Sequence, residues 1–472
     1  MAKVLVLGAG LTGLATAALL ARDGHAVTVV ERDPAPAPPP GQAWDGWPRQ
    51  GVNQFRLAHF MLPRWWSLVR AELPGVTEAL LAAGALRCNL LALLPERRRG
   101  PIRPADDRFE TVTARRPLLE AVLSRAAESA GVTISRGVAV TGLATDGHGA
   151  VPRVIGVLTA AGPPIHADLV VDCGGRRSAL PAWLVAAGAR PPVEEREPCG
   201  FVYYGRHFHG ELPEMHTNVL QAYDSLSVLT LPGDNGTWSV VLVTHGRDKA
   251  MRALRDPACW HQVLARYPLA AHWADGAPIT GVDVMAGIED RHRRLAVAGT
   301  PVATGVVTVG DAWACTNPSL GRGASIGLLH ALLLRDTLRE IDPAEHDKLA
   351  SRFDELTARA MEPLHQATVW LDRHRLAELE ADLAGEPYRP DDGRWAASKA
   401  LFAASLHDPE LTRAYSALAS FIAGPDEVFA EPGVRERVGR LSAGAPPYPL
   451  PGPSRAELLS TLDQAGAAGW PG

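Results

Sequence analysis

The stretch Val4-Leu5-Val6-Leu7-Gly8-Ala9-Gly10-Leu11-Thr12-Gly13-Leu14-Ala15 decides the fold of this 472-residue chain. An apolar run leads directly into the pattern G-x-G-x-x-G, and small and apolar residues then follow at helical spacing. A second apolar run, residues 26–30, closes on Glu31. This order predicts a strand, a tight turn, a helix and a parallel strand, which together form the unit that binds the pyrophosphate of a dinucleotide.

Each glycine of this pattern has a separate physical role. Gly8 allows the tight turn, Gly10 lets the backbone approach a phosphate, and Gly13 lets the helix pack closely on the strand. The backbone N–H groups of the first helical turn then point towards the phosphates. Glu31, at the end of the second strand, is placed to accept a hydrogen bond from a ribose hydroxyl group.

Length and composition narrow the class of protein. The chain is long enough for two or three domains, and its apolar content of 46% and charged content of 21% are those of a globular protein. A net charge of −5 argues against nucleic-acid binding. The five cysteines are scattered without a C-x-x-C pair, which argues against a disulfide framework or a zinc site. With no apolar run long enough to span a bilayer, a cytoplasmic protein without an integral membrane segment is expected.

Three further segments stand out in the first part of the chain. Residues 47–59 are polar and basic among large apolar residues, and in isolation such a segment is typical of a solvated loop. Arg116 and the proline after it open a helix with leucines at helical spacing. Residues 167–172 form a buried strand that ends at Asp172 and runs into a glycine turn.

Residues 179–284 change character and are rich in strand-forming residues, with turn signals between them. One face of such a sheet could line an apolar cleft while the other packs under helices. The pocket residues expected here are Phe201, Tyr203, Leu229 and Trp238, although for any one of them an ordinary core position is the alternative. His207 and His209 have a spacing that could hold a metal, but without a third ligand ordinary sheet histidines are favoured. From Asp256 to Trp273 the pattern is helical.

A second glycine-rich segment appears late in the chain. Residues 305–311 predict a buried strand ending in Gly310-Asp311, and a long amphipathic helix is expected from about residue 325 to 339. The loop between them carries Trp313 and the spaced residues Pro318, Gly321 and Gly323. Such a loop suits an anionic or electron-rich ligand, because several N–H groups point the same way. The alternative is an ordinary strand–loop–helix crossover.

Taken in order, these segments resemble the flavoprotein monooxygenase superfamily with the para-hydroxybenzoate hydroxylase fold. The resemblance implies an α/β protein with a Rossmann-type FAD-binding domain, an inserted mixed β-sheet substrate domain and a helical C-terminal region. The expected boundaries are residues 1–178 with 285–345 for the FAD domain, 179–284 for the substrate domain and 346–472 for the helical region.

The resemblance also implies which residues contact the cofactor. The first glycine turn would bind the ADP part of FAD, Gly310-Asp311 the ribityl chain and pyrophosphate, and the loop after it the isoalloxazine ring. The expected cofactor-binding residues are Gly8, Gly10, Leu11, Thr12, Gly13, Glu31, Arg32, Arg49, Gln54, Arg116, Asp172, Gly175, Gly310, Asp311, Pro318, Gly321, Gly323 and Ala324, with Trp313 added to the substrate pocket. No metal is expected.

A closer resemblance is to the flavin-dependent epoxidases of polyether biosynthesis, on Gly51 to His59, Arg116 to Leu119, and Asp172 to Ser178. Asn53 and Leu57 depart from that family's pattern. The resemblance implies a FAD-dependent monooxygenase that inserts one oxygen atom from O2, through a flavin C4a-hydroperoxide, into a largely apolar natural-product intermediate by epoxidation or hydroxylation. The flavin itself would carry the chemistry, and the resemblance makes His59 the best candidate for a catalytic side chain near the ring.

Two other functions stay open. A flavin-dependent reductase of isoprenoid double bonds shares the fold, and a non-catalytic flavin-binding protein would need the same cofactor residues. Only one complete dinucleotide fingerprint is present in the sequence. Electrons would therefore come from NAD(P)H, either directly at the flavin domain or through a separate flavin reductase.

Overall fold

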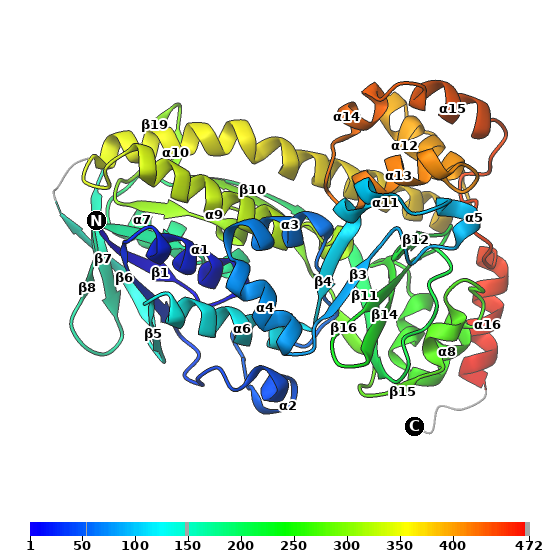
Figure 1. Ribbon diagram of the computed structural model, residues 1–472, viewed down its shortest axis with the longest axis horizontal. Coiled ribbons are helices and arrows are strands. Elements are labelled where there is room, and N and C mark those ends of the chain that lie inside the picture. The colour runs from blue at the N-terminus through cyan, green and yellow to red at the C-terminus, as the bar shows by residue number, and fades with distance from the viewer. Residues whose placement is uncertain (53, 147–150, 468–472) are drawn as a thin grey trace.

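The computed structural model describes residues 1–52, 54–146 and 151–467, so Asn53 lies outside the described residues. Its centre is a five-stranded parallel sheet in the order β20-β9-β1-β2-β5. Segments more than a hundred residues apart in sequence thus lie side by side (Figure 1). The strands are β1 (Lys3–Leu7), β2 (Ala26–Glu31), β5 (Thr133–Arg136), β9 (Leu169–Asp172) and β20 (Val306–Thr308).

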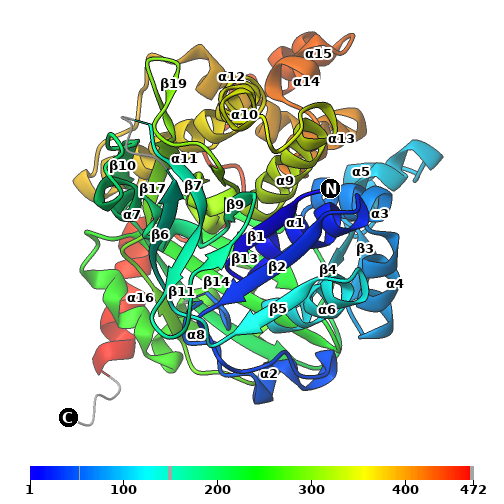
Figure 2. The ribbon, with the colours of Figure 1, turned by 90° about the vertical axis from the view of Figure 1, so that its left-hand side faces the viewer.

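Both faces of this sheet are covered. Helices α1 (Leu11–Arg22), α6 (Arg116–Ser129) and α9 (Gly323–Glu340) pack on one face, and a three-stranded antiparallel sheet with α7 (Leu180–Ala186) packs on the other (Figure 2). That sheet consists of β6 (Val140–Asp146), β7 (Arg153–Thr159) and β8 (Ile165–His166). Burial on both faces explains why β1 is apolar at every position after Lys3 instead of alternating.

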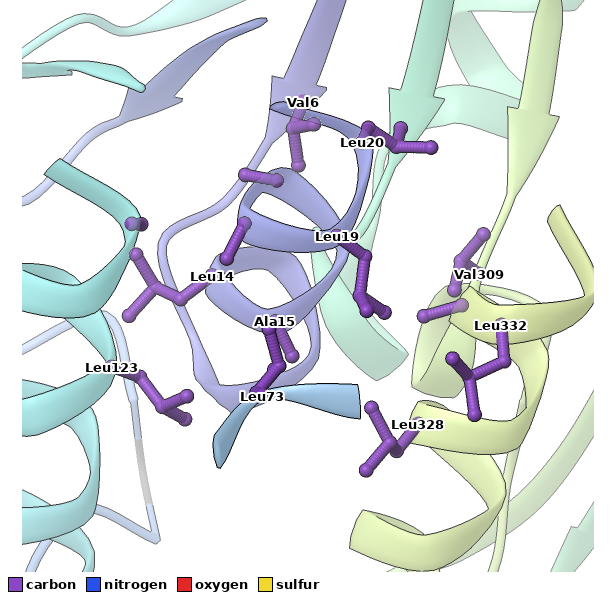
Figure 3. Close-up of a cluster of buried hydrophobic side chains, with 14 of the residues drawn as sticks. Val6, Leu14, Ala15, Leu19, Leu20, Leu73, Leu123, Val309, Leu328 and Leu332 are labelled. Carbon is purple, nitrogen blue, oxygen red and sulfur yellow. The ribbon is translucent and has the colours of Figure 1, made fainter. Parts of the chain in front are cut away.

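The helical face of the sheet forms the larger core. Val6 of β1, Leu14 and Leu19 of α1, and Leu123 of α6 converge there (Figure 3). Val309, which follows β20, and Leu328 and Leu332 of α9 close the cluster from the other side. The first glycine-rich unit and the late Gly-Asp segment are therefore packed into one rigid layer.

The second large sheet has six strands and lies beside the first. Its order is β12-β13-β14-β11-β15, with β16 also paired to β11. All of these pairings are antiparallel, so the expectation of a mixed sheet was wrong. The reason is that consecutive strands such as β12, β13 and β14 are joined by short turns, which connect only antiparallel neighbours. The strands are β11 (Phe201–His209), β12 (Leu220–Ala222), β13 (Ser227–Pro232), β14 (Thr237–His245), β15 (Ala277–Pro278) and β16 (Asp283–Met285).

Shorter helices and strands make up the rest of this part of the chain. The helix expected from Asp256 to Trp273 is shorter in the structure: α8 (Pro257–Leu264) ends before Pro268, and a short 3-10 turn, Ala271–Ala274, follows. Proline cannot continue a helix, because it lacks the N–H group and clashes with the preceding turn. The remaining elements in this part of the chain are α2 (Ala43–Gly46), α3 (Pro63–Glu72), α4 (Pro74–Ala82), β3 (Leu86–Asn89), α5 (Glu96–Arg99), β4 (Glu110–Thr113), β10 (Val193–Pro198), β17 (Glu289–Arg294), β18 (Ala296–Val297), β19 (Thr300–Pro301) and β21 (Ala314–Cys315).

The C-terminal region is helical, as expected, and it completes the core under the second sheet. Leu401, Leu411 and Leu458 pack in the same cluster as Tyr204 and Trp260. The helices α12 to α15 gather beyond one end of that sheet, while α16 lies against α8 (Figure 1). In the part of the chain that the structure describes, no helix is both long and apolar enough to cross a membrane. The helices are α10 (His346–Ala360), α11 (Glu362–Ala384), α12 (Gly393–Ser405), α13 (Pro409–Ala419), α14 (Pro425–Ala430), α15 (Val434–Leu441) and α16 (Arg455–Ala467).

Candidate active site

A continuous cavity of about 1710 Å³ runs from the carboxyl ends of β1, β2 and β9 to the second sheet and the C-terminal helices. Its volume exceeds the roughly 1,000 Å³ at the upper end of the range for a single ligand, so it has room for a dinucleotide and a second molecule. All the residues expected to bind the cofactor line this cavity, with the exception of Gly310. We call the end at the glycine turn the dinucleotide lobe and the end at the second sheet the substrate lobe.

The glycine turn of the dinucleotide lobe leaves space only where a ligand would need it. Gly8 has a φ of +97°, and a Cβ atom there would lie 2.8 Å from the carbonyl oxygen of Cys173. A Cβ atom on Gly13 would lie 2.0 Å from the carbonyl oxygen of Gly8. Gly10 is different, because the nearest atom to its Cβ position is Arg116 Nη2 at 3.8 Å. The first turn of α1 has no side-chain cap, so its N–H groups are available to a phosphate.

Glu31 is held in place at the end of β2. Its Oε2 accepts hydrogen bonds from Ala9 N at 2.9 Å and Arg49 Nη2 at 2.7 Å, and its Oε1 accepts from Asp33 N at 3.1 Å. Arg49 is enclosed, since its Nη1 also contacts Ala9 O and Glu120 Oε2, both at 2.8 Å. Arg49 lines the cavity, but its guanidinium already interacts with Glu31, Glu120 and the carbonyl of Ala9. Arg49 therefore holds Glu31 in position.

Gly310 does not line the cavity, because it is packed against Thr12 of α1. It has a φ of +65°, and a Cβ atom there would lie 2.8 Å from Thr12 Cγ2, while one on Gly327 of α9 would lie 2.5 Å from Thr12 Oγ1. Gly310 N also donates to His330 Nδ1 at 3.3 Å. The predicted role of Gly310 in contacting the cofactor was therefore wrong: it lets the late segment pack against α1.

Asp311 is the unpaired acceptor of the dinucleotide lobe. It lies deep in the protein, yet its side chain is exposed to the cavity and has no hydrogen-bond partner among the described residues. Burial raises the pKa of this carboxyl, while the charges of Arg116 and Arg176 oppose the rise. An acceptor that faces a cavity without a protein donor fits a ligand hydroxyl group, such as one on the ribityl chain of FAD.

The loop after Asp311 ends at another helix N-terminus. Gly321 adopts a left-handed conformation with a φ of +65°, and α9 then begins at Gly323 without a side-chain cap. A Cβ atom on Gly323 would meet only Asp311 Oδ1, at 4.0 Å. The N–H groups of Gly323 and Ala324 and the positive end of the α9 dipole are thus open to the cavity, which suits a negatively charged ring.

His59 and Arg116 meet between the two lobes, so residues 47–59 are not simply a solvated loop. Because the carbonyl of Leu57 can only accept, His59 Nδ1 donates to it at 3.0 Å, which leaves Nε2 to accept from Arg116 Nη1 at 3.4 Å. Burial and the nearby Arg116 lower the pKa of His59 to about 3. The imidazole is therefore neutral at physiological pH and has no proton to give as a general acid.

The remaining predicted residues of the dinucleotide lobe shape its walls. Asp172 accepts hydrogen bonds from Gly174 N at 2.8 Å and from the Ser178 hydroxyl, and so closes the turn that carries Gly175. Burial raises the pKa of this carboxyl. Arg32 donates to Gly51 O at 3.0 Å. Gln54 lines the cavity beside Met285 of β16.

The second sheet lines the substrate lobe with alternate residues. Phe201 and Tyr203 of β11 and Leu229 of β13 face the cavity, as expected. Trp238 of β14 faces the other way: it stacks on Phe208 and donates its indole N–H to Trp273 O at 2.8 Å. Its predicted place in the pocket was therefore wrong, because successive strand residues alternate between faces and Trp238 is out of phase with the cavity-lining Val241 and Val243.

Trp313 lines the cavity and is held edge-on by three histidines. Its ring centroid lies 5.3 Å from that of His292, 5.0 Å from His330 and 6.1 Å from His365. His207 also lines the cavity, whereas His209, on the same strand, is exposed. Within the described ranges, no group of three or more side chains is arranged to hold a metal ion.

Sequence reasoning missed a polar cluster at the border between the lobes. The Tyr203 hydroxyl donates to Asn317 Oδ1 and lies 2.6 Å from Ser319 Oγ. Asn317 Nδ2 donates to Asp372 Oδ1 at 2.8 Å, and Asn317 N donates to Asp290 Oδ1 at 2.8 Å. Asn317 stood beside a proline that was singled out, but Asp372 lies in a long helical run without any local signal.

The opposite wall of the substrate lobe was also missed. It comes from α11, α12, α13 and the turn after α13, which the sequence indicated only as helical. Burial raises the pKa of the Tyr203 phenol far above its usual range, and it also raises that of Asp372. The Tyr203 phenol is therefore neutral at physiological pH. The wall residues include Trp370, Leu371, Phe402, Tyr415, Leu418 and Phe421.

Comparisons of the sequence with known proteins also indicate a FAD site. The family model described as FAD dependent oxidoreductase matches residues 3–104. Protein Rv3254 of Mycobacterium tuberculosis is 30% identical over 390 residues, which cover 76% of this chain and 77% of that protein.

Solved structures show the same fold at low identity. PqsL, described as a probable FAD-dependent monooxygenase from Pseudomonas aeruginosa, has a TM-score of 0.59 at 17% identity and covers 89% of this chain and 100% of its own. The myxobacterial chondrochloren halogenase CndH has a TM-score of 0.53 at 18% identity and covers 100% of this chain and 98% of its own. The chain therefore belongs to one family with protein Rv3254. Its first hundred residues match the FAD dependent oxidoreductase family, and the chain as a whole has the para-hydroxybenzoate hydroxylase fold of these flavoproteins.

Proposed function

We propose that this enzyme is a FAD-dependent monooxygenase that places one oxygen atom of O2 into a largely apolar natural-product intermediate, by epoxidation or hydroxylation. One observation carries the proposal. The cavity that exposes Asp311 and the N-terminus of α9 continues without interruption into a lobe whose wall on the side of the second sheet is mainly apolar, while charged side chains such as Arg375, Glu378 and Lys399 line it from the C-terminal helices. A group bound at the α9 end would thus face an apolar ligand across the border between the lobes. The apolar wall includes Phe201, Leu229, Leu231, Val241, Val243 and Phe421.

Different residues of the dinucleotide lobe would bind different parts of FAD. The α1 N-terminus and the open space at Gly10 receive the pyrophosphate, and Asp311 accepts from a ribityl hydroxyl group. The N–H groups of Gly323 and Ala324 and the α9 dipole stabilise negative charge on the ring. FAD, when bound, supplies the activation of O2 and the transfer of the oxygen atom.

The substrate lobe supports a substrate that reacts without ionising. Phe201 and Val241 keep water from the reacting end, which protects a reactive flavin from side reactions. His59 and Tyr203 at the border are neutral, because the pKa of His59 is lowered to about 3 and burial raises that of the Tyr203 phenol. Neither is suited to remove a proton from a phenol, whereas an alkene needs no such base.

The same proposal assigns roles to the parts of the chain. We infer that residues 1–178 and 285–345 form the FAD-binding domain and residues 179–284 the substrate domain. Residues 346–472 would close the substrate lobe, since α11 to α13 supply its far wall. Electrons would come from NAD(P)H, bound transiently at the flavin domain or used by a separate flavin reductase.

The decisive experiment separates this reaction from its two alternatives. The FAD-loaded protein is incubated with NADPH, or with NADH and a flavin reductase, and with a panel of apolar polyenes under labelled O2. We expect substrate-dependent oxygen consumption and one labelled oxygen atom in the product. Turnover of the polyene without oxygen would instead identify a double-bond reductase. Bound FAD without substrate-dependent NAD(P)H or oxygen consumption would identify a non-catalytic flavoprotein.

A further inference from the structure

Arg322, the residue directly before helix α9, is a cation that lines the cavity without a counter-charge. Its Nη1 donates to Thr368 Oγ1 of α11 at 3.1 Å, and its guanidinium lies over the ring of Phe421, 5.0 Å from the ring centroid. No carboxylate of the described residues lies within ion-pair distance of it. Burial lowers the pKa of Arg322 to about 10, so the guanidinium stays charged at physiological pH.

Two donors of this guanidinium are open to the cavity. Nε and Nη2 make no hydrogen bond to the described residues, and they are not among the buried polar atoms that lack a partner. A ligand in the cavity can therefore reach them. These two atoms form the edge of a guanidinium that offers two parallel N–H groups, the same edge with which Arg115 binds the carboxylate of Asp234 at 2.9 and 2.8 Å.

The guanidinium of Arg322 lies on the side of the substrate lobe. Its charge opposes the rise in pKa that burial causes at Asp372 of α11, and it has no such effect on Asp311 of the dinucleotide lobe. Phe421, over which it lies, packs against the same hydrophobic cluster as Leu229 of the second sheet. Arg322 therefore reaches from the start of α9 to the border of the apolar wall.

The charged side chains at the far end of the substrate lobe already satisfy one another. Arg375 donates five hydrogen bonds to protein groups, including one to Glu378 at 3.0 Å. Lys399 forms an ion pair with the same carboxylate at 3.1 Å. Asp372 does not compensate Arg322, because it accepts a hydrogen bond from Asn317 instead and burial raises its pKa far above the usual range. The open guanidinium at the border thus differs from the paired charges at the far end.

A charge deep in a protein is unfavourable unless a group of opposite charge accompanies it. The positive end of the α9 dipole lies beside Arg322 and adds to the positive potential. Departures from charge pairing are expected at functional sites, where a ligand supplies the missing group. The ligand group that matches two parallel N–H donors and a positive charge is a carboxylate.

Building on the proposed function, we propose that Arg322 binds a carboxylate of the substrate at the border between the two lobes. The substrate is then an amphipathic acid, whose apolar body lies along β11, β13 and β14 of the second sheet. Arg322 directly precedes the N–H groups of Gly323 and Ala324, which are proposed to face the flavin ring. The carbon that is oxidised therefore lies within a few bonds of the carboxylate, and Arg322 determines which double bond reaches the ring.

Three probes of equal length test this subsite without turnover. Decanoate, 1-decanol and decylammonium are titrated below their micelle concentrations and at fixed ionic strength into the FAD-loaded protein. Tryptophan fluorescence reports binding, since Trp313 and Trp370 line the cavity. We expect decanoate to bind about tenfold or more tightly than the alcohol, and the ammonium to bind most weakly. Equal binding of decanoate and decanol, or tighter binding of the ammonium, would overturn the proposal.

Three variants assign the preference to Arg322. Arg322→Met should abolish the preference for decanoate and leave decanol binding unchanged, while Arg322→Lys, which keeps the charge, should retain part of it. Thr368→Val removes the hydrogen bond that orients the guanidinium and should weaken decanoate binding several-fold. The control Arg435→Met, at an exposed cation that also lines the cavity, should change neither probe. A preference that survives Arg322→Met, or Thr368→Val where the methionine variant does not fold, would overturn the assignment.

Two competing assignments have their own readouts. Lys399→Gln should keep the preference for decanoate, and its loss there would place the carboxylate at the far end of the lobe instead. Arg322→Met should keep FAD affinity within about threefold, and a loss of FAD would assign the guanidinium to the cofactor; either result would overturn the proposal. None of these readouts depends on oxygen consumption. A protein that prefers decanoate but does not oxidise polyenes would disprove only the proposed reaction, and one that oxidises polyenes without this preference would disprove only the subsite.

Discussion

The two lobes of the cavity are built from different parts of the chain. The dinucleotide lobe uses backbone: glycines at close approaches and the uncapped N-termini of α1 and α9. The substrate lobe uses side chains, which arrive from the second sheet on one side and from α11 to α13 on the other. A backbone site depends on local order in the sequence, whereas a side-chain wall depends on which distant elements the fold brings together. The following predictions test this difference, beginning with the largest expected effect.

Gly13→Ala should disrupt the dinucleotide lobe most severely. A Cβ atom at this position would lie 2.0 Å from Gly8 O, so α1 must move away from β1. We expect a loss of about 3 kcal/mol or more in the free energy of unfolding, together with loss of FAD. Circular dichroism melting and the flavin absorbance of the purified protein measure the two effects.

Gly10→Ala is the matched control, because its Cβ position is 3.8 Å from the nearest atom, Arg116 Nη2. It should keep the unfolding temperature of the apoprotein and lose only affinity for FAD. If both glycine variants melt at the same temperature, the division into a packing glycine and a ligand glycine fails.

Trp238→Ala tests the face of β14 that turns away from the cavity. The side chain is 2% exposed and packs on Phe208, so its removal leaves a cavity in the core under the second sheet. We expect a loss of about 3–5 kcal/mol in the free energy of unfolding, with unchanged FAD affinity in the protein that remains folded. Denaturant titration gives the first quantity and flavin fluorescence the second.

Val241→Phe, three residues along the same strand, provides the contrast. Its side chain faces the substrate lobe, so a larger group should fill ligand space and cost little stability. Binding of a bulky polyene should fall while the unfolding midpoint stays close to that of the wild type. A large loss of stability in this variant would place residue 241 in the closed core instead.

Asp311→Ala should weaken FAD binding more than tenfold while leaving the fold intact. The carboxylate has no protein donor, so its loss removes a hydrogen bond with a ligand hydroxyl, on the order of 2 kcal/mol, and no hydrogen bond within the protein. Titration of the apoprotein with FAD measures the affinity. Asp283→Ala, which changes an acidic residue of the cavity on β16, is the control and should leave FAD affinity unchanged. Equal affinity in the Asp311 variant would remove that residue from the site.

The smallest effect concerns the border between the lobes. Burial raises the pKa of Asp290 to about 6, above the value of about 3.9 for an unfolded chain. The folded protein therefore holds this proton more tightly than the unfolded one. The stability it provides is fully present below about pH 4 and is lost as the pH rises through about 6.

Asp290→Asn cannot titrate, and it keeps an oxygen that can accept from Asn317 N. Its unfolding free energy should fall less than that of the wild type between about pH 4 and 6, by on the order of 1–2 kcal/mol. Urea titrations at several pH values measure the difference. Parallel curves for the two proteins would show that the carboxyl is already ionised in the folded state.

The same contrast explains what the sequence could predict. Gly8, Gly13 and Glu31 lie within one short stretch, and a strand–turn–helix signal is local, so the parallel sheet and nearly the whole dinucleotide lobe could be inferred. Gly310 was placed in the right segment but given the wrong role, because its partner Thr12 is almost three hundred residues away in the chain. Arg49 was expected at the cofactor, yet only the folded structure reveals the carboxylates around it.

The substrate lobe was less predictable. The phase of a strand decides which residues face a cavity, and composition alone did not set that phase for Trp238. No local sequence pattern predicted a role for Asp372 or Arg322, because the partners of both residues lie on other elements. Side-chain walls of this kind follow from tertiary packing, which no short stretch of sequence encodes.

Thr12 is packed against both Gly310 and Gly327, so the turn for the pyrophosphate and the start of the late helix are a single mechanical unit. If these two segments hold the two ends of FAD, as proposed above, their separation is set before the cofactor arrives. FAD then behaves as a chelating ligand, because docking one end raises the effective concentration of the other. Adenosine diphosphate or riboflavin alone would forgo this gain, and each fragment would be held far more weakly than the whole cofactor. The packing of Thr12 between Gly310 and Gly327 would thus favour an intact dinucleotide over either of its fragments.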